Sequence, residues 1–231
     1  YPDDVAADWA PYQDGQWNWI APWGWTWVDA APWGFAPFHY GRWAYLRNRW
    51  GWIPGPRDER AIYAPALVAF VGGSGWGATI GVGAPIGWFP LGPGDIYFPW
   101  YRSSRDYYSR INISNIHRRD RNHQRDLQQR LQREYGVYQK PRPLRDIHYA
   151  NRDAPHAYSV VSAKVFAAGH PLRGARLRVD AERLRNAPLL SHGAGVQPHA
   201  HTGGDRTYTR SMPLAGFERS VVARHAPPPA A

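Results

Sequence analysis

The chain has 231 residues, enough for one large or two modest domains, and a formal net charge of +10. It contains no cysteine, which excludes disulfides, iron–sulfur clusters, thiolate zinc sites and cysteine nucleophiles. Residues 1–101 carry 8 acidic and 5 basic side chains, whereas residues 102–231 carry 10 acidic and 23 basic ones. All 13 tryptophans lie between Trp9 and Trp100. Composition therefore predicts a chain of two unlike parts.

The first part repeats a pattern of aromatic residues. Residues 9–28 are followed by a second copy at 35–53, with an offset of about 25 residues. Aromatic residues alternate within each copy, for example at Trp17 and Trp19, and period two with aromatic enrichment is typical of β-strands. We predict four or five short antiparallel strands here, with glycine and proline at their turns and edges.

The rest of the first part is also rich in aromatic residues, glycine and proline, but it does not contain the repeat. Residues 63–71 read as a buried strand, and residues 72–83 as a glycine-rich loop. The most apolar stretch, residues 61–71, is too short to span a bilayer, so the sequence predicts no transmembrane helix. Since the sequence starts at Tyr1 and not at a methionine, we expect a leader or an upstream domain to have been removed.

A polar helix is predicted from about Asn115 to Tyr135. Leu127, Leu131 and Tyr135 recur at every fourth position, and Gly136 stands where a helix would end. So narrow an apolar stripe indicates a helix that lies on a surface and does not enter a core.

These patterns predict a mainly β fold of short antiparallel strands in tandem tryptophan-rich hairpin units, with one arginine-rich helix and an extended C-terminal region. We divide the chain into a Trp/Pro-rich β domain at 1–112, an Arg/Gln-rich helix and linker at 113–140, a small compact β-containing segment at 141–190 and a low-complexity tail at 191–231. The third segment has predicted strands at 158–162 and 177–179, a turn at 166–171 and a helical turn at 181–186. The composition of the tail is typical of disorder.

Several blocks resemble a bacterial tryptophan-rich family, the domain of unknown function 6600. The blocks are residues 32–43 (PWGFAPFHYGRW), 50–55 (WGWIPG), 63–68, 87–93, 99–101 and, later, 151–155 with Phe166 and 169–171. The resemblance covers roughly residues 8–190. It implies an exported envelope protein, periplasmic, outer-membrane-associated or extracellular, often found beside FecR-type domains. The family supplies no catalytic residues.

The aromatic residues could have either of two roles. Planar rings with a polar handle form platforms for sugars or peptides, but they also fill the cores of small β units that are poor in aliphatic residues. Arg42 could cover a ring as a cation–π lid, while His39 is better explained by a structural hydrogen bond than by catalysis. The candidate binding residues of this part are Trp33, His39, Tyr40, Arg42, Trp43, Trp50, Trp52, Trp100 and Tyr101.

The arginine-rich stretch supplies four further candidates, Arg118, Arg119, Arg121 and Arg125. They could form a solvated helix face or bind an acidic protein or an anionic lipid surface. Nucleic acid is the least favoured partner, because interleaved acidic residues reduce the local charge and no RNA-binding signature is present.

The sequence carries no motif of a known catalytic site. His192, His199 and His201 have a spacing seen in metal sites, but their glycine-rich surroundings do not favour one, and we expect no metal or cofactor. The sequence thus favours a non-catalytic structural subunit that binds neighbouring proteins or further copies of itself. The alternative is a glycan-binding module for peptidoglycan or exopolysaccharide.

Overall fold

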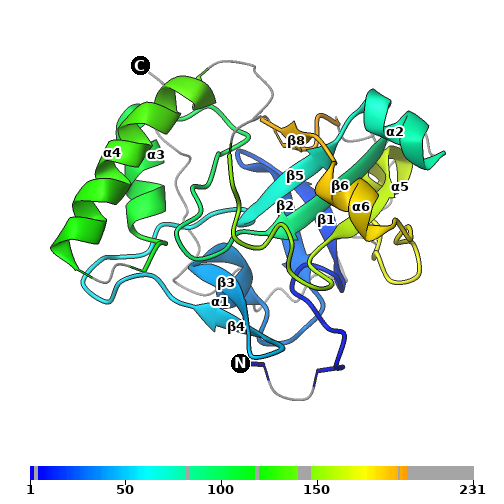
Figure 1. Cartoon of the computed structure of the whole chain (residues 1–231), viewed down its shortest axis with the longest axis horizontal. Coiled ribbons are helices and arrows are strands. Elements are labelled where there is room, and N and C mark those ends of the chain that lie inside the picture. The colour runs from blue at the N-terminus through cyan, green and yellow to red at the C-terminus, as the bar shows by residue number, and fades with distance from the viewer. Residues whose placement is uncertain (3–4, 82–83, 118–119, 140–146, 192, 197–231) are drawn as a thin grey trace.

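The computed structural model describes residues 1–2, 5–81, 84–117, 120–139, 147–191 and 193–196. Most of the predicted tail, namely residue 192 and residues 197–231, and the stretch at 140–146 therefore lie outside the described residues. Among those described, the structure consists of antiparallel strands in small sheets, with short helices around them (Figure 1).

Two tryptophan-rich hairpins form in the repeat, as its alternation predicts. β1 (Gly15–Ile20) pairs with β2 (Gly24–Asp29), and β3 (Arg42–Leu46) pairs with β4 (Arg49–Ile53). The second hairpin turns through Arg47 and Asn48, which both have positive φ, at 52° and 59°. Two left-handed residues in a two-residue loop match the twist of the paired strands. The predicted hairpin units are thus confirmed.

The largest sheet has four strands in the order β7-β6-β5-β8. β5 (Val68–Gly72) and β6 (Pro85–Pro90) come from the first predicted segment, while β7 (Ser159–Ser162) and β8 (Leu189–Leu190) come from the third. The third segment is therefore not a separate compact unit. Its strands complete a sheet that starts about 90 residues earlier in the chain, because an apolar sheet edge is stabilised by pairing with any strand that reaches it.

The described residues contain more helix than the sequence predicts. The helices are α1 (Phe35–His39), α2 (Ser74–Ile80), α3 (Arg105–Ile113), α4 (Arg121–Tyr138), α5 (Ala163–Ala168) and α6 (Ala181–Arg185). Helix α6 agrees with the predicted helical turn. The predicted loop at 72–83 contains α2, and the turn predicted at 166–171 begins inside α5, so both of those predictions are wrong. Residues 177–179 form no strand, although the amide of Leu177 donates to the carbonyl of Val160 at 2.7 Å.

The predicted polar helix is confirmed as α4, with different ends. It begins after Asp120, whose side chain accepts from the amide of His123. It also continues through Gly136 to Tyr138, although glycine is unfavourable inside a helix. The buried ring of Tyr138 stacks on Tyr108 of α3 with ring centroids 5.2 Å apart, and this packing outweighs the local preference for an end at Gly136.

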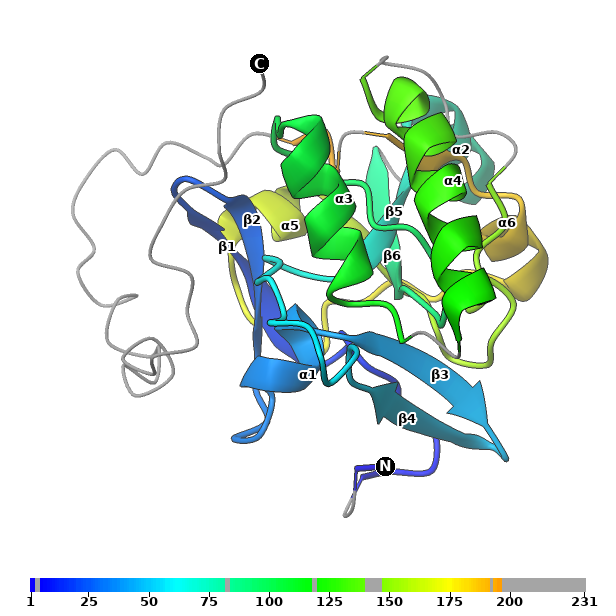
Figure 2. The ribbon, with the colours of Figure 1, turned by 90° about the vertical axis from the view of Figure 1, so that its left-hand side faces the viewer.

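The helix pair α3–α4 stands at one end of the molecule, as two views show (Figure 1, Figure 2). The sheet of β5 and β6 lies in the middle, and α5 and α6 lie at the opposite end in Figure 1. The hairpin of β3 and β4 extends along another side, next to α1 (Figure 2).

The core between these elements is built from aromatic rings. Trp17 is fully buried, and its ring lies within 6.2 Å, centroid to centroid, of Trp27, Phe70, Trp88, Trp100 and Phe166. These rings come from β1, β2, β5, β6, α5 and the segment after β6, so one side chain joins both halves of the chain. Most pairs meet edge to face, the geometry that the charge distribution of aromatic rings favours.

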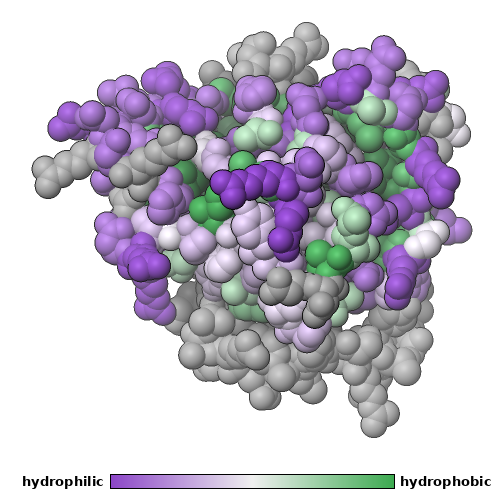
Figure 3. Space-filling model, turned by 60° about the horizontal axis from the view of Figure 1, so that its bottom comes forward, coloured by the Kyte–Doolittle hydropathy of each residue, from purple (hydrophilic) through white to green (hydrophobic). Residues whose placement is uncertain are grey.

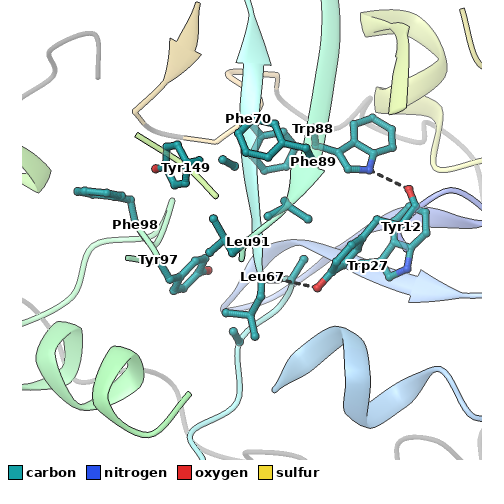
Figure 4. Close-up of a cluster of buried hydrophobic side chains, with 14 of the residues drawn as sticks. Tyr12, Trp27, Leu67, Phe70, Trp88, Phe89, Leu91, Tyr97, Phe98 and Tyr149 are labelled. Carbon is teal, nitrogen blue, oxygen red and sulfur yellow. Dashed lines mark hydrogen bonds between the residues drawn. The ribbon is translucent and has the colours of Figure 1, made fainter. Parts of the chain in front are cut away.

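Tyr12 ties the first hairpin to the central sheet by its polar atoms. Its hydroxyl donates to the carbonyl of Phe38 at 2.8 Å and accepts from the amide of Leu67 at 3.1 Å. The indole nitrogen of Trp88 donates to the carbonyl of Tyr12 at 2.9 Å (Figure 4). The buried aromatic residues thus contribute hydrogen bonds as well as apolar area.

The two tryptophans of β1 allow a direct test of this core. We expect Trp17→Ala to lower the free energy of unfolding by about 3–5 kcal/mol, because it opens a large cavity among five rings. Trp19→Ala is the control: Trp19 lies two residues further on the same strand and is 47% exposed, so its loss is expected to cost less than about 1 kcal/mol. Urea denaturation of both variants makes the measurement, and equal losses would contradict the assignment of Trp17 to the core.

Candidate functional site

The structure places three of the predicted aromatic binding residues in the interior. His39, Trp43 and Trp50 are all buried. Trp43 donates from its indole nitrogen to the carbonyl of Pro37 at 2.9 Å, and its ring packs on Phe38. These residues are part of the core and do not form a platform for a ligand.

Four other candidates are partly buried and packed against the hydrophobic core: Tyr40, Trp52, Trp100 and Tyr101. The indole nitrogen of Trp52 donates to the carbonyl of Tyr40 at 2.8 Å, and that of Trp100 donates to the carbonyl of Trp23 at 3.1 Å. Their polar atoms are therefore used within the fold.

Trp33 is the one aromatic candidate that is well exposed, at 40%. Its ring lies beside Trp9, with centroids 6.0 Å apart and planes tilted by 59°. Trp19 is more exposed, at 47%, and is not among the residues selected from the sequence. Alternation along a strand places Trp19 on the same face as the buried Trp17, so the sequence carries no signal for its exposure. Trp19 belongs to β1, whereas Trp33 precedes α1.

The exposed apolar side chains of the described residues are few. On the face shown in Figure 3, the hydrophobic residues form small groups among hydrophilic and intermediate ones. Exposed large apolar side chains of the described residues are single positions, namely Tyr1, Val5, Trp19, Trp33 and Leu46. Scattered apolar residues of this kind are ordinary on a protein surface.

Arg42 is not the surface lid that its position at a turn predicts. It is 1% exposed, and its guanidinium lies inside the fold. Nε and Nη2 donate to the carbonyl of Asp95 at 3.1 and 2.9 Å, Nη1 donates to the carbonyl of Gly41 at 2.9 Å, and Nη2 also donates to Oδ1 of Asn112 at 3.2 Å. Burial lowers the pKa of Arg42 to about 10, so the group stays charged at neutral pH.

The carboxylate of Asp95 faces backbone amides. Oδ2 accepts from the amide of Gly92 at 2.7 Å, and both carboxylate oxygens accept from the amide of Ala150, at 3.1 and 3.2 Å. Burial raises the pKa of Asp95 to about 6, while these hydrogen bonds and the charge of Arg42 act in the opposite direction. Asp95 is thus a structural anion that holds residues 92–95 against residue 150.

Buried asparagines complete this polar network. Asn112 accepts from the amide of Tyr97 at 2.7 Å and donates to its carbonyl at 3.0 Å. Asn115 accepts from the amide of Gly41 at 2.9 Å, and Asn151 donates to the carbonyl of Trp43 at 2.8 Å. The network therefore joins β3 to α3 and to the segment around residue 150.

His39 makes a structural hydrogen bond, as the sequence analysis predicts. Its Nδ1 lies 2.8 Å from the carbonyl of Ala64, so this nitrogen carries the proton and donates. Burial lowers the pKa of His39 to about 4, although the carbonyls of Ala64 and Pro65 oppose this shift. The imidazole is therefore neutral at neutral pH.

The arginine-rich candidates fall only in part on the described residues. Arg118 and Arg119 lie outside them, as does the side chain of Arg121, while Arg125 is exposed on α4. On the opposite face of α4, Leu127, Leu131 and Tyr135 are buried against the rest of the fold. Helix α4 thus has the one-sided packing that its narrow apolar stripe predicts.

A groove of about 410 Å³, which the sequence did not predict, lies at the other end of the molecule. It lies between residues 152–158 and 176–185 and carries four arginines, Arg152, Arg176, Arg178 and Arg185. The signal that could have found it is the alternation of arginine with leucine and valine at 176–179, which places both arginines on one side of an extended segment.

Neither this groove nor the described residues elsewhere show a metal centre. Among the residues that the structure describes, no group of three or more His, Asp or Glu side chains could hold a metal ion. His192, His199 and His201 lie outside the described part of the chain. None of the described helices is both long and apolar enough to cross a membrane.

Replacing Arg42 tests the polar network. We expect Arg42→Met to lower the free energy of unfolding by about 3–5 kcal/mol, because the carbonyls of Gly41 and Asp95 and the amide oxygen of Asn112 lose their donor. Arg47→Met removes the same charge at an exposed turn position and is expected to change stability by less than about 0.5 kcal/mol. Urea denaturation compares the two; a mild effect of Arg42→Met would show that water replaces the lost donors.

The pH dependence of stability tests the burial of His39. The native imidazole stays neutral down to about pH 4, whereas an unfolded chain binds the proton below about pH 6.5. The stabilisation that His39 contributes is therefore complete above pH 6.5 and is lost as the pH falls to 4, by roughly 3 kcal/mol.

The raised pKa values of Asp29 and Asp95, about 7 and about 6, change the free energy of unfolding with pH in the opposite direction. Subtracting the curve of a His39 variant from that of wild type therefore isolates the effect of His39. The measurement is the free energy of unfolding of wild type and His39→Gln between pH 4 and pH 8. Wild type should lose stability relative to the variant as the pH falls, and parallel curves would contradict the prediction.

Comparison with known proteins gives one match. Residues 1–95 match the model of a family of unknown function (DUF6600). This region contains both hairpins, α1, α2, β5 and β6, and it ends at Asp95; the later block that resembles the same family, residues 151–171, is outside the match. No curated protein and no solved structure matches the chain. The N-terminal 95 residues of this chain are thus similar to the family of unknown function DUF6600.

Proposed function

We propose that this chain is a non-catalytic structural protein of the bacterial envelope that binds neighbouring protein subunits. The observation that carries the proposal is the two-sided character of α4. Leu127, Leu131 and Tyr135 fix the helix to the fold, and the outer face exposes long arginine and glutamine side chains: Arg125, Gln128, Gln129, Gln132 and Arg133. A rigid helix that presents such a face is suited to a protein partner, since arginine is enriched in protein interfaces.

The chemistry of the perturbed groups also supports a role without catalysis. Asp29, His39, Arg42 and Asp95 have the shifted pKa values that often mark active sites. Each of them forms hydrogen bonds within the fold, and none lines the arginine groove. Their shifts follow from burial in an aromatic core.

The charge distribution favours an acidic partner. Residues 102–231 carry a net charge of +13, almost all of it from arginine, whose planar fork pairs with carboxylates. An envelope location, next to FecR-type domains in related proteins, is part of the proposal and rests on the family resemblance. The partner is another protein subunit or a further copy of this chain; an anionic lipid surface would use the same charges.

A glycan-binding module is the second candidate. The exposed rings of Trp19 and Trp33 favour it, because indole faces stack on sugar rings. Against it, these two rings come from different segments, and the aromatic contacts elsewhere are predominantly edge-to-face contacts within the core. The geometry therefore supports the protein partner better.

Charge reversal on α4 tests the proposal. Immobilised wild-type protein should retain envelope proteins from the native membranes, and Arg125→Glu/Arg133→Glu should reduce this retention at least about tenfold by repelling an acidic surface. The control Arg47→Glu/Lys164→Glu changes the charge equally at exposed positions away from α4 and should retain the same proteins. Quantitative mass spectrometry of the eluates makes the measurement.

Two outcomes would contradict it. Equal retention by the α4 variant and the control would remove α4 from the interface. Retention of cell-wall fragments that is lost in Trp19→Ala/Trp33→Ala and unchanged by charge reversal would favour the glycan-binding module instead.

A further inference from the structure

The arginine groove lies far from α4 and has no part in the function proposed above. One wall is formed by residues 152–158 and the other by residues 176–185, and Asp8 and Gln13 reach its rim from the N-terminal segment. In Figure 1 the helix α6, which forms part of the second wall, and α4 stand at opposite ends of the molecule. The groove is therefore a separate surface.

Hydrogen bonds from the Arg152 side chain to backbone carbonyls connect the two walls of the groove. Nη2 of Arg152 donates to the carbonyls of Arg185 and Ala187, at 2.8 and 2.6 Å. On the second wall, Asp180 caps α6 by accepting from the amide of Arg183 at 2.9 Å. These bonds hold both walls in place, so the groove is formed before any ligand binds.

The groove is cationic. Arg152, Arg176, Arg178 and Arg185 line it, against the two carboxylates of Asp8 and Asp153. The ion pairs within the described residues are formed by other arginines, Arg110 with Asp106 and Arg183 with Asp180, and not by these four. Their charges are therefore not neutralised by contact with a carboxylate of the described part of the chain.

The floor of the groove is aliphatic. Val160 of β7 and Leu177, Val179 and Leu184 line it, and they are buried or half-buried. The ring of Tyr158 lies at its base, where burial raises the pKa of the hydroxyl to about 12 and the nearby charge of Arg152 lowers it. Apart from this half-buried ring, the floor consists of branched aliphatic side chains, which present no flat face to a sugar ring; this favours a ligand with apolar side chains of its own.

Residues 176–179 set the spacing of the charges. The amide of Leu177 donates to the carbonyl of Val160 at 2.7 Å, which holds this segment along the outer edge of β7. Arg176 and Arg178 are exposed, whereas Leu177 and Val179 are half-buried, the alternation of an extended chain. Two side chains on the same side of an extended segment start about 7 Å apart along the chain.

We propose that this groove binds an extended acidic peptide whose carboxylates occupy alternate positions and whose intervening side chains are apolar. An extended ligand repeats its side chains with the same period as residues 176–179, so successive carboxylates face Arg176 and Arg178. The side chains between them point the other way, onto the aliphatic floor. Carboxylate–guanidinium pairs then fix the register, and apolar burial adds affinity.

A matched pair of peptides tests the register. The first is a blocked hexapeptide in which glutamate and valine alternate, and the second has the same composition with three glutamates followed by three valines. Fluorescence anisotropy with the full chain at low ionic strength should show tighter binding of the alternating peptide, by at least about fivefold. Added salt should weaken the binding, because the pairs are exposed to solvent.

Variants of the protein test the site. Arg176→Gln/Arg178→Gln should weaken binding of the alternating peptide by about five- to thirtyfold, because two exposed charge pairs are lost. Arg47→Gln/Arg102→Gln removes the same charge at exposed positions outside the groove and should bind as wild type does. All four positions are exposed, so folding is expected to be unaffected, and the urea midpoint of each variant checks this.

Three results would overturn the proposal: no binding of the alternating peptide at low ionic strength, equal binding of both peptides, or equal effects of the groove variant and its control. Equal binding of both peptides would indicate a general attraction of anions to a basic surface. None of these results depends on α4, so the groove and the α4 interface succeed or fail separately.

Discussion

Burial of the Arg42 guanidinium is the constraint on which the arrangement of the other elements depends. A charged group that is 1% exposed is stable only where acceptors replace the water that it has lost. Gly41, Asp95 and Asn112 provide those acceptors, from three different parts of the chain. The requirement fixes the hairpin β3–β4, the segment after β6 and helix α3 relative to one another. Asn115 and Asn151 extend the same bonds to residues 62 and 90.

Around this polar centre, aromatic rings do most of the packing. The twelve-residue block at 32–43 illustrates how: Phe38 and Trp43 fill the core, and His39 and Arg42 bond to the backbone. Among the aromatic residues of the block, Trp33 alone is well exposed. The conspicuous residues of this block therefore build the fold. Its resemblance to a family says more about how these proteins fold than about what they bind.

The second half of the chain has two roles. Part of it completes the core, through β7, β8 and the ring of Phe166, which contacts Trp17 and Trp25. Other described parts of it present arginine outward on two separate surfaces, α4 and the groove beside β7. This arrangement differs from an aromatic body with a free basic arm, the picture that composition favours, because residues 147–191 fold back onto that body. The proposed interaction surfaces are consequently rigid, which lowers the entropy lost on binding a partner.

The sequence by itself determined the local elements whose periodicity is strong. Alternating tryptophans specified the hairpins β1–β2 and β3–β4, and the fourfold spacing of Leu127, Leu131 and Tyr135 specified α4, because these patterns arise from contacts between near neighbours. It did not determine which rings are exposed, that Arg42 is buried, or that two arginine-bearing segments face each other across a groove. Those features depend on contacts between residues far apart in the chain, such as Arg42 with Asn112 and Arg152 with Arg185. Only the tertiary structure decided them, since the energy of burying a side chain depends on which distant groups surround it and not on its neighbours in the sequence.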